Sequence, residues 1–443
     1  GEEQFPARLD ENGELVRTER YIAATAHGLG GITHLHFSLS PERSLEYVRV
    51  LQSDIKRNTR LGIPLLFFNE ACHGHLAQGS TMFPLPPALA ATFDADLVMR
   101  VYDAIGAEVR ARGGTMCFTP VLDLARDPRW GRMEETFGED AFLVARMGVA
   151  AVMGLQGGDQ LSAERVAACV KHFAGYGQSQ GGQQGARADI PPRKLRDEIL
   201  VPFEVAVREG RARAVMPAYN EIDGVPAHGN RELLDTILRG EWLFEGIVAS
   251  DFGGVGQLET DHGVASDPTD AARIALEAGV DMDLPRGASF EALRPNVVDY
   301  PDLLKLVDRS VARVLKLKFE LGLFETPAPD GTRSLQVVHG DTCQALARES
   351  ADKGIILLKN AHSMLPLNRE TLQRVAVVGP HSRYLDFGGV SAHNTGVSVL
   401  DGLKEAVGDG IEIRWAQGCA LTDSDETLPH ITKPADGQSA SQI

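Results

Sequence analysis

The chain is short of basic residues and has no long hydrophobic run. Its 443 residues include 44 lysines and arginines against 61 aspartates and glutamates, which gives a formal charge of −17. This negative surplus disfavours nucleic acid and anionic membrane surfaces as the main partners, because like charges repel. The most apolar stretch, 143–155, is interrupted by Arg146. No run reaches the roughly 18 apolar residues that a membrane-spanning helix needs. We therefore expect no nucleic-acid partner and no membrane partner.

Cysteine is also scarce. The five cysteines, at positions 72, 117, 169, 343 and 419, form no Cys-x-x-Cys pair, so a disulfide framework is not indicated. Four of them lie among apolar or small residues and are expected to be buried thiols. No Gly-x-Gly-x-x-Gly follows the first strand, which argues against a dinucleotide fold, and we expect no cofactor. The chain begins with Gly1 and not Met, so we assign it to no cellular compartment. We also make no prediction of its oligomeric state.

Short strand-like runs alternate with longer amphipathic stretches over the first 325 residues. The strand-like runs are 31–35, 65–69, 115–122, 167–173, 214–219, 246–251 and 280–284. The helical patterns between them include 95–111, 141–155, 195–209, 231–239 and 268–278. Repeated strand–helix alternation indicates a parallel sheet. At this length we predict an α/β fold of the (β/α)8 TIM-like barrel type for residues 1–325, with a doubly wound open sheet as the alternative.

A second domain is expected after the barrel. The helix predicted at 301–319 is followed by a segment rich in Pro and Gly, and we interpret 326–341 as a linker. A helix at 342–354 and buried strands at 355–358 and 375–378 then open an α/β sandwich domain over 342–443. The residues from Gly418 onward are polar and patternless. We therefore expect this domain to be partial and the chain to be a fragment, trimmed at both ends.

Several polar residues stand where the predicted strands end. Each follows an apolar run, where a charge is costly unless it is paired or functional. In a barrel the carboxyl ends of the strands form one mouth, which is where active sites lie. The residues are Asn69, Glu70, Asp123, Lys171, His172, Tyr219, Asn220, Ser250, Asp251 and Asp283.

The mixture of side chains at this mouth suits a sugar. The cations Lys171 and Arg132 favour the ionised form of nearby carboxylates, which fits a nucleophile or an electrostatic stabiliser and not a general acid. Acidic, amide and basic groups beside the aromatic side chains of Tyr219, Phe252 and Trp130 can hold several hydroxyls. No glycine-rich helix start suggests a phosphate site.

Five segments resemble the signature motifs of glycoside hydrolase family 3, in the family's order and spacing. A later stretch, from Glu349 through Leu357-Leu-Lys-Asn360 to Pro380, resembles the start of the family's second domain. The likeness covers nearly the whole chain. The five segments are 70–74 (EACHG), 127–140 (DPRWGRMEETFGED), 171–173 (KHF), 216–219 (MPAY) and 250–252 (SDF).

This resemblance implies a retaining, exo-acting β-glycosidase that hydrolyses terminal non-reducing β-linked sugars of an oligosaccharide or aryl β-glycoside. Asp251 matches the nucleophile, which attacks the anomeric carbon and forms a covalent glycosyl-enzyme. Phe252 stands where the family has tryptophan and keeps an aromatic wall. Tyr219 matches a tyrosine beside the nucleophile, and Met216 matches a residue that lines the same pocket.

The resemblance also assigns sugar-binding residues and indicates a preferred sugar. Arg132, Lys171 and His172 match residues that hold the hydroxyls of the terminal sugar. Glu70 stands where many family β-glucosidases have aspartate, and the Asn-Glu-Ala-x-His-Gly form is typical of β-xylosidase-like members. The longer side chain crowds the hydroxymethyl group of glucose, so we expect a preference for xylose, with β-glucosidase activity as the other outcome. Such a difference contributes only about 1–3 kcal/mol.

No general acid is assigned. In the N-acetylglucosaminidase branch of the family the acid is a histidine in the loop after Lys-His. Here that loop, 173–184, has no second histidine and no acidic residue, which excludes the branch. In the other branch the acid is a glutamate of the second domain, which we expect beyond Ile443. Glu405, Glu412 and Glu426 match no family position.

Two other functions remain as alternatives. His34 and His36 form a His-x-His pair near the end of an early strand, which is a metal-ligand spacing and fits a metal-dependent barrel hydrolase. The second alternative is a non-catalytic sugar-binding fragment, a barrel that has lost turnover with its partner domain.

Overall fold

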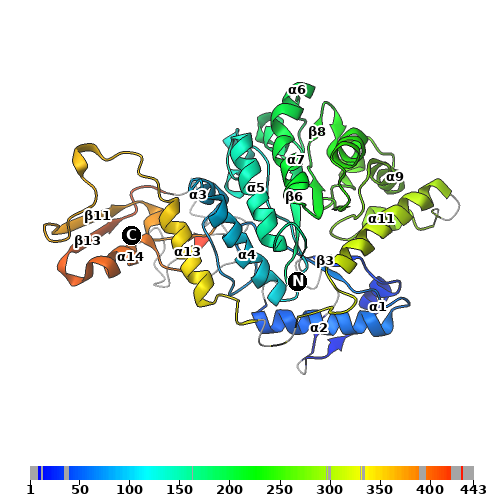
Figure 1. Ribbon diagram of the computed structural model, residues 1–443, viewed down its shortest axis with the longest axis horizontal. Helices are drawn as coiled ribbons and strands as arrows, with labels where there is room; N and C mark the ends of the chain where they lie inside the picture. Colours follow the sequence, from blue (N-terminus) through cyan, green and yellow to red (C-terminus); the bar gives the residue numbers. More distant parts are fainter. Residues whose placement is uncertain are drawn as a thin grey trace. The chain divides into compact units, whose positions relative to one another are not determined.

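The computed structural model describes residues 8–10, 13–33, 39–161, 163–295, 297, 301–329, 331, 335–388, 396–420 and 431–432. The chain divides into two compact units, Gly1–Gly354 and Ile355–Ile443 (Figure 1). Helix α13 (Asp341–Gly354) belongs to the first unit, where Glu349 pairs with Arg100. The linker that we assigned to 326–341 stays a prediction.

A six-stranded parallel sheet is the frame of the first unit. An isolated parallel bridge from Ala249 to Met282 adds the 280–284 segment beside the last strand. This is the α/β, TIM-like arrangement that the alternation of strands and helices predicts. The strands run in the order β10 (Ile247–Val248), β7 (Ala214–Pro217), β6 (Ala167–Phe173), β5 (Met116–Cys117), β4 (Leu66–Asn69) and β3 (Gly31–Thr33).

The side chains of these strands alternate between two apolar clusters. Phe68, Met116, Cys169, Met216 and Ile247 pack together on one face, with partners that come mostly from other strands. Their chain neighbours, such as Val170, Val215 and Val248, lie in the cluster that the helices complete. Successive residues of a strand point to opposite faces. One face therefore forms the interior of the barrel and the other the layer under the helices.

Helices cover the outer face of the sheet. Figure 1 shows α4, α5 and α7 side by side, and they contact one another in that order. Several begin where the sequence places a capping side chain: Asp94 accepts from the amide of Leu97, and Asp140 accepts from that of Leu143. The helices are α1 (Glu19–Thr25), α2 (Pro41–Asn58), α3 (Pro86–Ala90), α4 (Ala95–Ala111), α5 (Ala141–Gln156), α6 (Pro192–Lys194), η5 (Leu195–Ile199), α7 (Val201–Arg208), η7 (Glu232–Glu241), α8 (Gln257–Thr260), α9 (Pro268–Ala278), α10 (Ala288–Ala292) and α11 (Pro301–Glu320).

The strand predicted at 115–122 is shorter than expected. Only Met116–Cys117 forms regular ladder pairs, and Val121 then makes single bridges to Thr136 and Lys171. Pro120 has no amide hydrogen and cannot donate to a neighbouring strand, so the ladder cannot continue through it. The chain beyond Pro120 is thereby left in an irregular conformation that leads to Asp123.

The second unit contains a parallel pair of strands, β11 (Arg374–Val378) and β13 (Glu412–Ala416), with helix α14 (Val399–Val407). Two short strands, β12 (Leu385–Asp386) and β14 (Ile431–Thr432), pair in antiparallel fashion. The prediction of a buried strand at 355–358 is wrong, because this segment has no regular structure and Ile355 and Leu358 are 78% and 92% exposed. The strand at 375–378 is present but only partly buried: Val377 is 8% exposed and Val378 is 65% exposed. A two-stranded pair offers each strand only one neighbour and covers few of its side chains.

Candidate active site

The polar residues that end the predicted strands gather at one edge of the sheet. Glu70 follows β4, Lys171 and His172 lie near the end of β6, Tyr219 follows β7 and Asp251 follows β10. Because these strands are parallel neighbours, their carboxyl ends bring the side chains to a common mouth. Asp283 takes another role: its Oδ2 accepts from the amides of Ser289 and Phe290 at the start of α10.

Asp251 is held at this mouth through one of its two oxygens. Its Oδ1 accepts from the hydroxyl of Tyr219 at 2.8 Å and from the amide of Phe252 at 2.7 Å, and its Oδ2 lies 3.8 Å from Nε2 of His172. Burial raises the pKa of Asp251, while the charge of Lys171 and these two hydrogen bonds act against the rise. Oδ2 is therefore the oxygen of Asp251 that these two hydrogen bonds leave open.

Lys171 and Glu70 form a buried ion pair across the mouth. The ammonium of Lys171 lies 2.9 and 3.1 Å from the two carboxylate oxygens of Glu70. Burial lowers the pKa of Lys171, but Glu70 and Glu135 outweigh that effect, so its pKa is raised and it keeps its charge. The charged ammonium can donate to a ligand, and the glutamate can accept from one.

A chain of hydrogen bonds fixes the protonation of His172. Glu135 binds Arg132 through two hydrogen bonds of 2.6 and 2.8 Å, and Nη2 of Arg132 lies 3.0 Å from Nε2 of His172. Because a guanidinium can only donate, Nε2 is the acceptor. The proton then lies on Nδ1, which donates to Oδ2 of Asp123 at 2.8 Å. Burial, Arg132 and Lys171 all hold the pKa of His172 well below its usual value, so the imidazole is neutral.

Aromatic rings form the wall above these groups. Tyr176 makes edge contacts with Trp130 at 5.3 Å, with His172 at 5.0 Å and with Tyr219 at 5.8 Å between ring centroids. The guanidinium of Arg132 lies 5.4 Å from the centre of the Tyr176 ring, a cation–π contact that fixes it further.

Phe252 and Met216 lie below the mouth. Phe252 packs edge-on against Phe118 at 5.8 Å. Met216 is almost fully buried in the apolar cluster inside the barrel. The structure therefore places Met216 beneath the site, as support for the residues around it, while Phe252 is half-buried next to Asp251.

These observations agree with the comparison to known proteins. Residues 13–317 match the glycosyl hydrolase family 3 N-terminal domain, and residues 355–441 match the C-terminal domain of the same family. The chain belongs to glycosyl hydrolase family 3. The family assignment made from the five motifs is confirmed.

The relatives that resemble this chain include proteins named β-xylosidase and proteins named β-glucosidase. A putative β-xylosidase of Formosa agariphila is 43% identical, over 83% of this chain and 49% of the relative. A periplasmic β-glucosidase of Salmonella typhimurium is 35% identical, over 85% of this chain and 49% of the relative. Among solved structures, a β-glucosidase of Erythrobacter marinus superposes with a TM-score of 0.89 at 38% identity, over 95% of this chain and 57% of the other. The chain thus spans about half the length of the curated relatives it matches.

The structure brings to this mouth residues that the sequence motifs do not single out. Asp123 is among the strand-end residues but has no predicted role, and Glu135 lies within the 127–140 motif without one. Tyr176 and His228 lie in short 3-10 helices that no local pattern marks as part of a site. The amide of Asp251 donates to Nε2 of His228 at 3.1 Å, so His228 holds the backbone of that residue.

The remaining predictions concern metals, thiols and membranes. His34 and His36 lie outside the described residues, and the described part contains no group of three or more His, Cys, Asp or Glu side chains arranged to hold a metal ion. Cys72, Cys117, Cys169 and Cys343 are buried thiols, as expected for four of the five. Within the described part, no helix has both the length and the apolar character that crossing a membrane requires.

Proposed function

We propose that the full-length protein is a retaining, exo-acting β-glycosidase that removes terminal β-linked xylose or glucose residues. The observation that carries the proposal is the carboxylate of Asp251, bound through Oδ1 to Tyr219 and Phe252 and facing a mouth of fixed donors with Oδ2. The names of the family relatives, β-xylosidase and β-glucosidase, support the same class of substrate.

The reaction follows from this arrangement. Oδ2 of Asp251 attacks the anomeric carbon of the terminal sugar, and the bond from that carbon to the leaving oxygen breaks. The leaving oxygen takes a proton from a general acid, and the sugar is held as an ester on Asp251. Water, deprotonated by the same acid–base group, then attacks the anomeric carbon and restores the free carboxylate. Two displacements on one carbon retain its β configuration.

The general acid is a group other than the three carboxylates beside Asp251. Glu70 is paired with Lys171, Glu135 with Arg132, and Asp123 with the imidazole of His172. Each is already engaged with a donor, so none is placed to protonate a leaving group. In line with the family resemblance, we assign the acid to a glutamate of the second domain in the full-length protein.

The hydroxyls of the sugar are bound by the groups around Asp251. Lys171 and Arg132 donate, and Glu70 and Asp123 accept. Because hydrogen bonds hold the Arg132–Glu135 pair and the Lys171–Glu70 pair in place, their polar groups are oriented before the sugar arrives. A preorganised polar site of this kind stabilises developing charge without reorganising during the reaction.

Nucleophile replacement tests the function. In the full-length protein, Asp251→Asn should lower kcat on an aryl β-xyloside by several orders of magnitude, because the amide cannot form the glycosyl ester. Asp283→Asn, a strand-end aspartate that caps α10, is the matched control and should keep activity within a few-fold. Turnover in Asp251→Asn at the wild-type rate would refute the assignment.

We further propose that xylose is preferred over glucose because of Glu70. Its carboxylate is drawn to Lys171, so the extra methylene occupies the space that a hydroxymethyl group needs. Glu70→Asp should move the ratio of kcat/KM for nitrophenyl xyloside over glucoside toward glucose by about tenfold or more. An unchanged ratio in Glu70→Asp would show that another residue sets the preference.

A further inference from the structure

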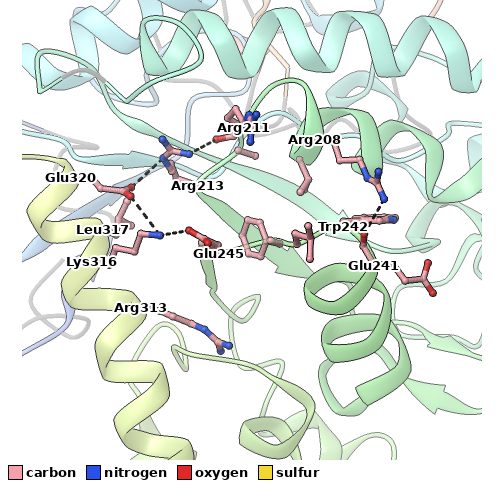
Figure 2. Close-up of a pocket in the computed structure, with 15 residues that line it drawn as sticks. Arg208, Arg211, Arg213, Glu241, Trp242, Glu245, Arg313, Lys316, Leu317 and Glu320 are labelled. Atoms are coloured by element: carbon pink, nitrogen blue, oxygen red, sulfur yellow. Dashed lines mark hydrogen bonds and ion pairs between the residues drawn. The ribbon is translucent and has the colours of Figure 1, made fainter.

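A second cavity opens at the opposite edge of the sheet from Asp251. Its volume is about 580 Å³, and it is lined by residues 207–208, 211–213, 241–246 and part of α11 (Figure 2). The first two segments lead into β7 and β10, so the cavity lies at the amino ends of strands whose carboxyl ends form the site described above. The chemistry at Asp251 makes no use of it.

Basic side chains outnumber acidic ones in the lining of this cavity, although Arg208 and Arg313 also pair with Glu204 and Asp281 just outside it. Five basic and three acidic side chains line it, whereas the chain as a whole carries a formal charge of −17. Figure 2 shows the residues of α11 on one side and Arg208, Glu241 and Trp242 on the other. The charged lining residues are Arg208, Arg211, Arg213, Arg313, Lys316, Glu241, Glu245 and Glu320.

Every carboxylate of the cavity is already paired. Glu320 lies 3.1 Å from Nε of Arg213, and Glu245 lies 2.5 Å from Nζ of Lys316. Glu241 is bound by two hydrogen bonds from Arg196, which stands outside the cavity. These pairs neutralise the acidic groups and tie α11 to the loops before β7 and β10.

Arg211 is the basic residue of the lining that none of these carboxylates binds. Its guanidinium makes no hydrogen bond or ion pair within the part of the chain that the structure describes, and its side chain is exposed at the cavity. Its backbone is held in place, because its carbonyl oxygen accepts from Gln156 at 3.1 Å and from Arg213 at 3.2 Å. Arg211 also has a φ of +58°, a left-handed conformation that is uncommon for a side chain of this size. The backbone of Arg211 is thus held in place, while its guanidinium is exposed at the cavity and has no partner among the described residues.

The rest of the lining is apolar. Leu243 is 76% exposed, whereas Trp242 and Phe244 are each 6% exposed and Leu317 is buried in α11. The cavity therefore offers an exposed apolar side chain, set on a packed base, beside a positively charged group. Its volume falls in the range of about 300–1,000 Å³ that is usual for small-molecule sites.

We propose that this cavity binds a small organic anion, with a carboxylate or phosphate group on the guanidinium of Arg211 and the body of the molecule against the apolar side chain of Leu243. A planar guanidinium binds either group through two parallel hydrogen bonds. Such a ligand binds independently of the sugar, since the two sites lie at opposite edges of the sheet.

Binding measurements on the full-length protein test the proposal. We would measure the binding of benzoate, inorganic phosphate and uncharged benzyl alcohol by titration calorimetry. The ionic strength is kept constant, so that general salt effects are the same in every titration. Benzoate tests charge with an apolar body, phosphate tests charge alone, and benzyl alcohol tests the body alone. The variants are Arg211→Gln and Arg211→Lys, with Arg231→Gln, an exposed arginine outside the cavity, as the matched control.

The proposal expects saturable binding of benzoate or phosphate that is weakened by about tenfold or more in Arg211→Gln, since a charge-assisted pair is lost. Arg211→Lys should retain part of the affinity, and Arg231→Gln should bind like the wild type. Hydrolysis of an aryl β-glycoside should be unchanged in all three variants, which shows that they fold. No saturable anion binding, equal binding in Arg211→Gln, or equal affinity for benzyl alcohol and benzoate would overturn it.

Discussion

The hydroxyl of Tyr219 controls how readily Asp251 ionises. It has one proton and lies 2.8 Å from Oδ1 of Asp251 and 2.9 Å from the carbonyl oxygen of Phe252. Because the ionised carboxylate is a stronger acceptor than the carbonyl oxygen, the hydroxyl donates its hydrogen bond to Asp251. Burial raises the pKa of Asp251, and the hydrogen bond from Tyr219 is one of the interactions that act against the rise. Tyr219→Phe removes that interaction and leaves the ring.

The size of the effect follows from the strength of the hydrogen bond. A hydrogen bond to a charged group contributes about 1.5–3 kcal/mol, and about 1.4 kcal/mol corresponds to one pH unit. Since the amide of Phe252 still binds the same oxygen, we take the lower end and expect the pKa of Asp251 to rise by about one further pH unit. The proposed nucleophile must be ionised, so activity exists above this pKa and is lost as the pH falls through it. The acid limb of the kcat/KM profile should therefore move to higher pH by the same amount.

The assay is the pH dependence of kcat/KM for an aryl β-glycoside, measured on the full-length protein. Tyr21→Phe is the matched control, because the hydroxyl of Tyr21 in α1 also donates to an aspartate, Asp54 of α2, at 2.8 Å. Its acid limb should coincide with that of the wild type. If Tyr219→Phe lowers kcat/KM by the same factor at every pH and does not shift the acid limb of the profile, the reasoning is refuted. The hydroxyl would then act on the sugar and not on the ionisation of Asp251.

Three further predictions concern stability, positioning and protonation. Asp281, whose side chain is fully buried, binds Arg239 at 2.7 Å and Arg313 at 2.9 Å. Asp281→Ala should therefore lower the free energy of unfolding in urea by about 3–5 kcal/mol. Asp302→Ala, at a position 98% exposed, should change it by less than about 0.5 kcal/mol, and equal effects would contradict the argument. His228→Leu should lower kcat more than it changes KM, because the amide of Asp251 loses its acceptor, while His228→Gln should restore much of the rate. If His228→Leu keeps the kcat of the wild type, His228 does not position Asp251. His172 should stay neutral through the pH range around the ordinary histidine pKa of about 6.5, and an NMR titration that protonates it there would disprove the hydrogen-bond chain to Asp123.

Local patterns in the sequence are enough to predict the class of fold and the place of the proposed site. Helices 95–111 and 268–278 and strand 167–173 lie where periodicity and capping residues predict them. Hydrophobic periodicity is a local property, and so is the position of a polar residue at the end of an apolar run. For that reason Glu70, Lys171, His172, Tyr219 and Asp251 could be selected together before their contacts were known.

Only the tertiary structure decided how these residues are paired and which others support them. The proton on Nδ1 of His172 depends on Arg132 and Asp123, which are 40 and 49 positions away in the chain. His228 reaches Asp251 from a 3-10 helix, and among the described residues no side chain pairs with Arg211, because Glu320 pairs with Arg213 and Glu245 with Lys316. The exposure of Ile355–Leu358 also depends on tertiary contacts, since a segment is buried only where other parts of the chain pack over it. Contacts between distant segments are set by packing of the whole chain, and no local pattern of residues encodes them.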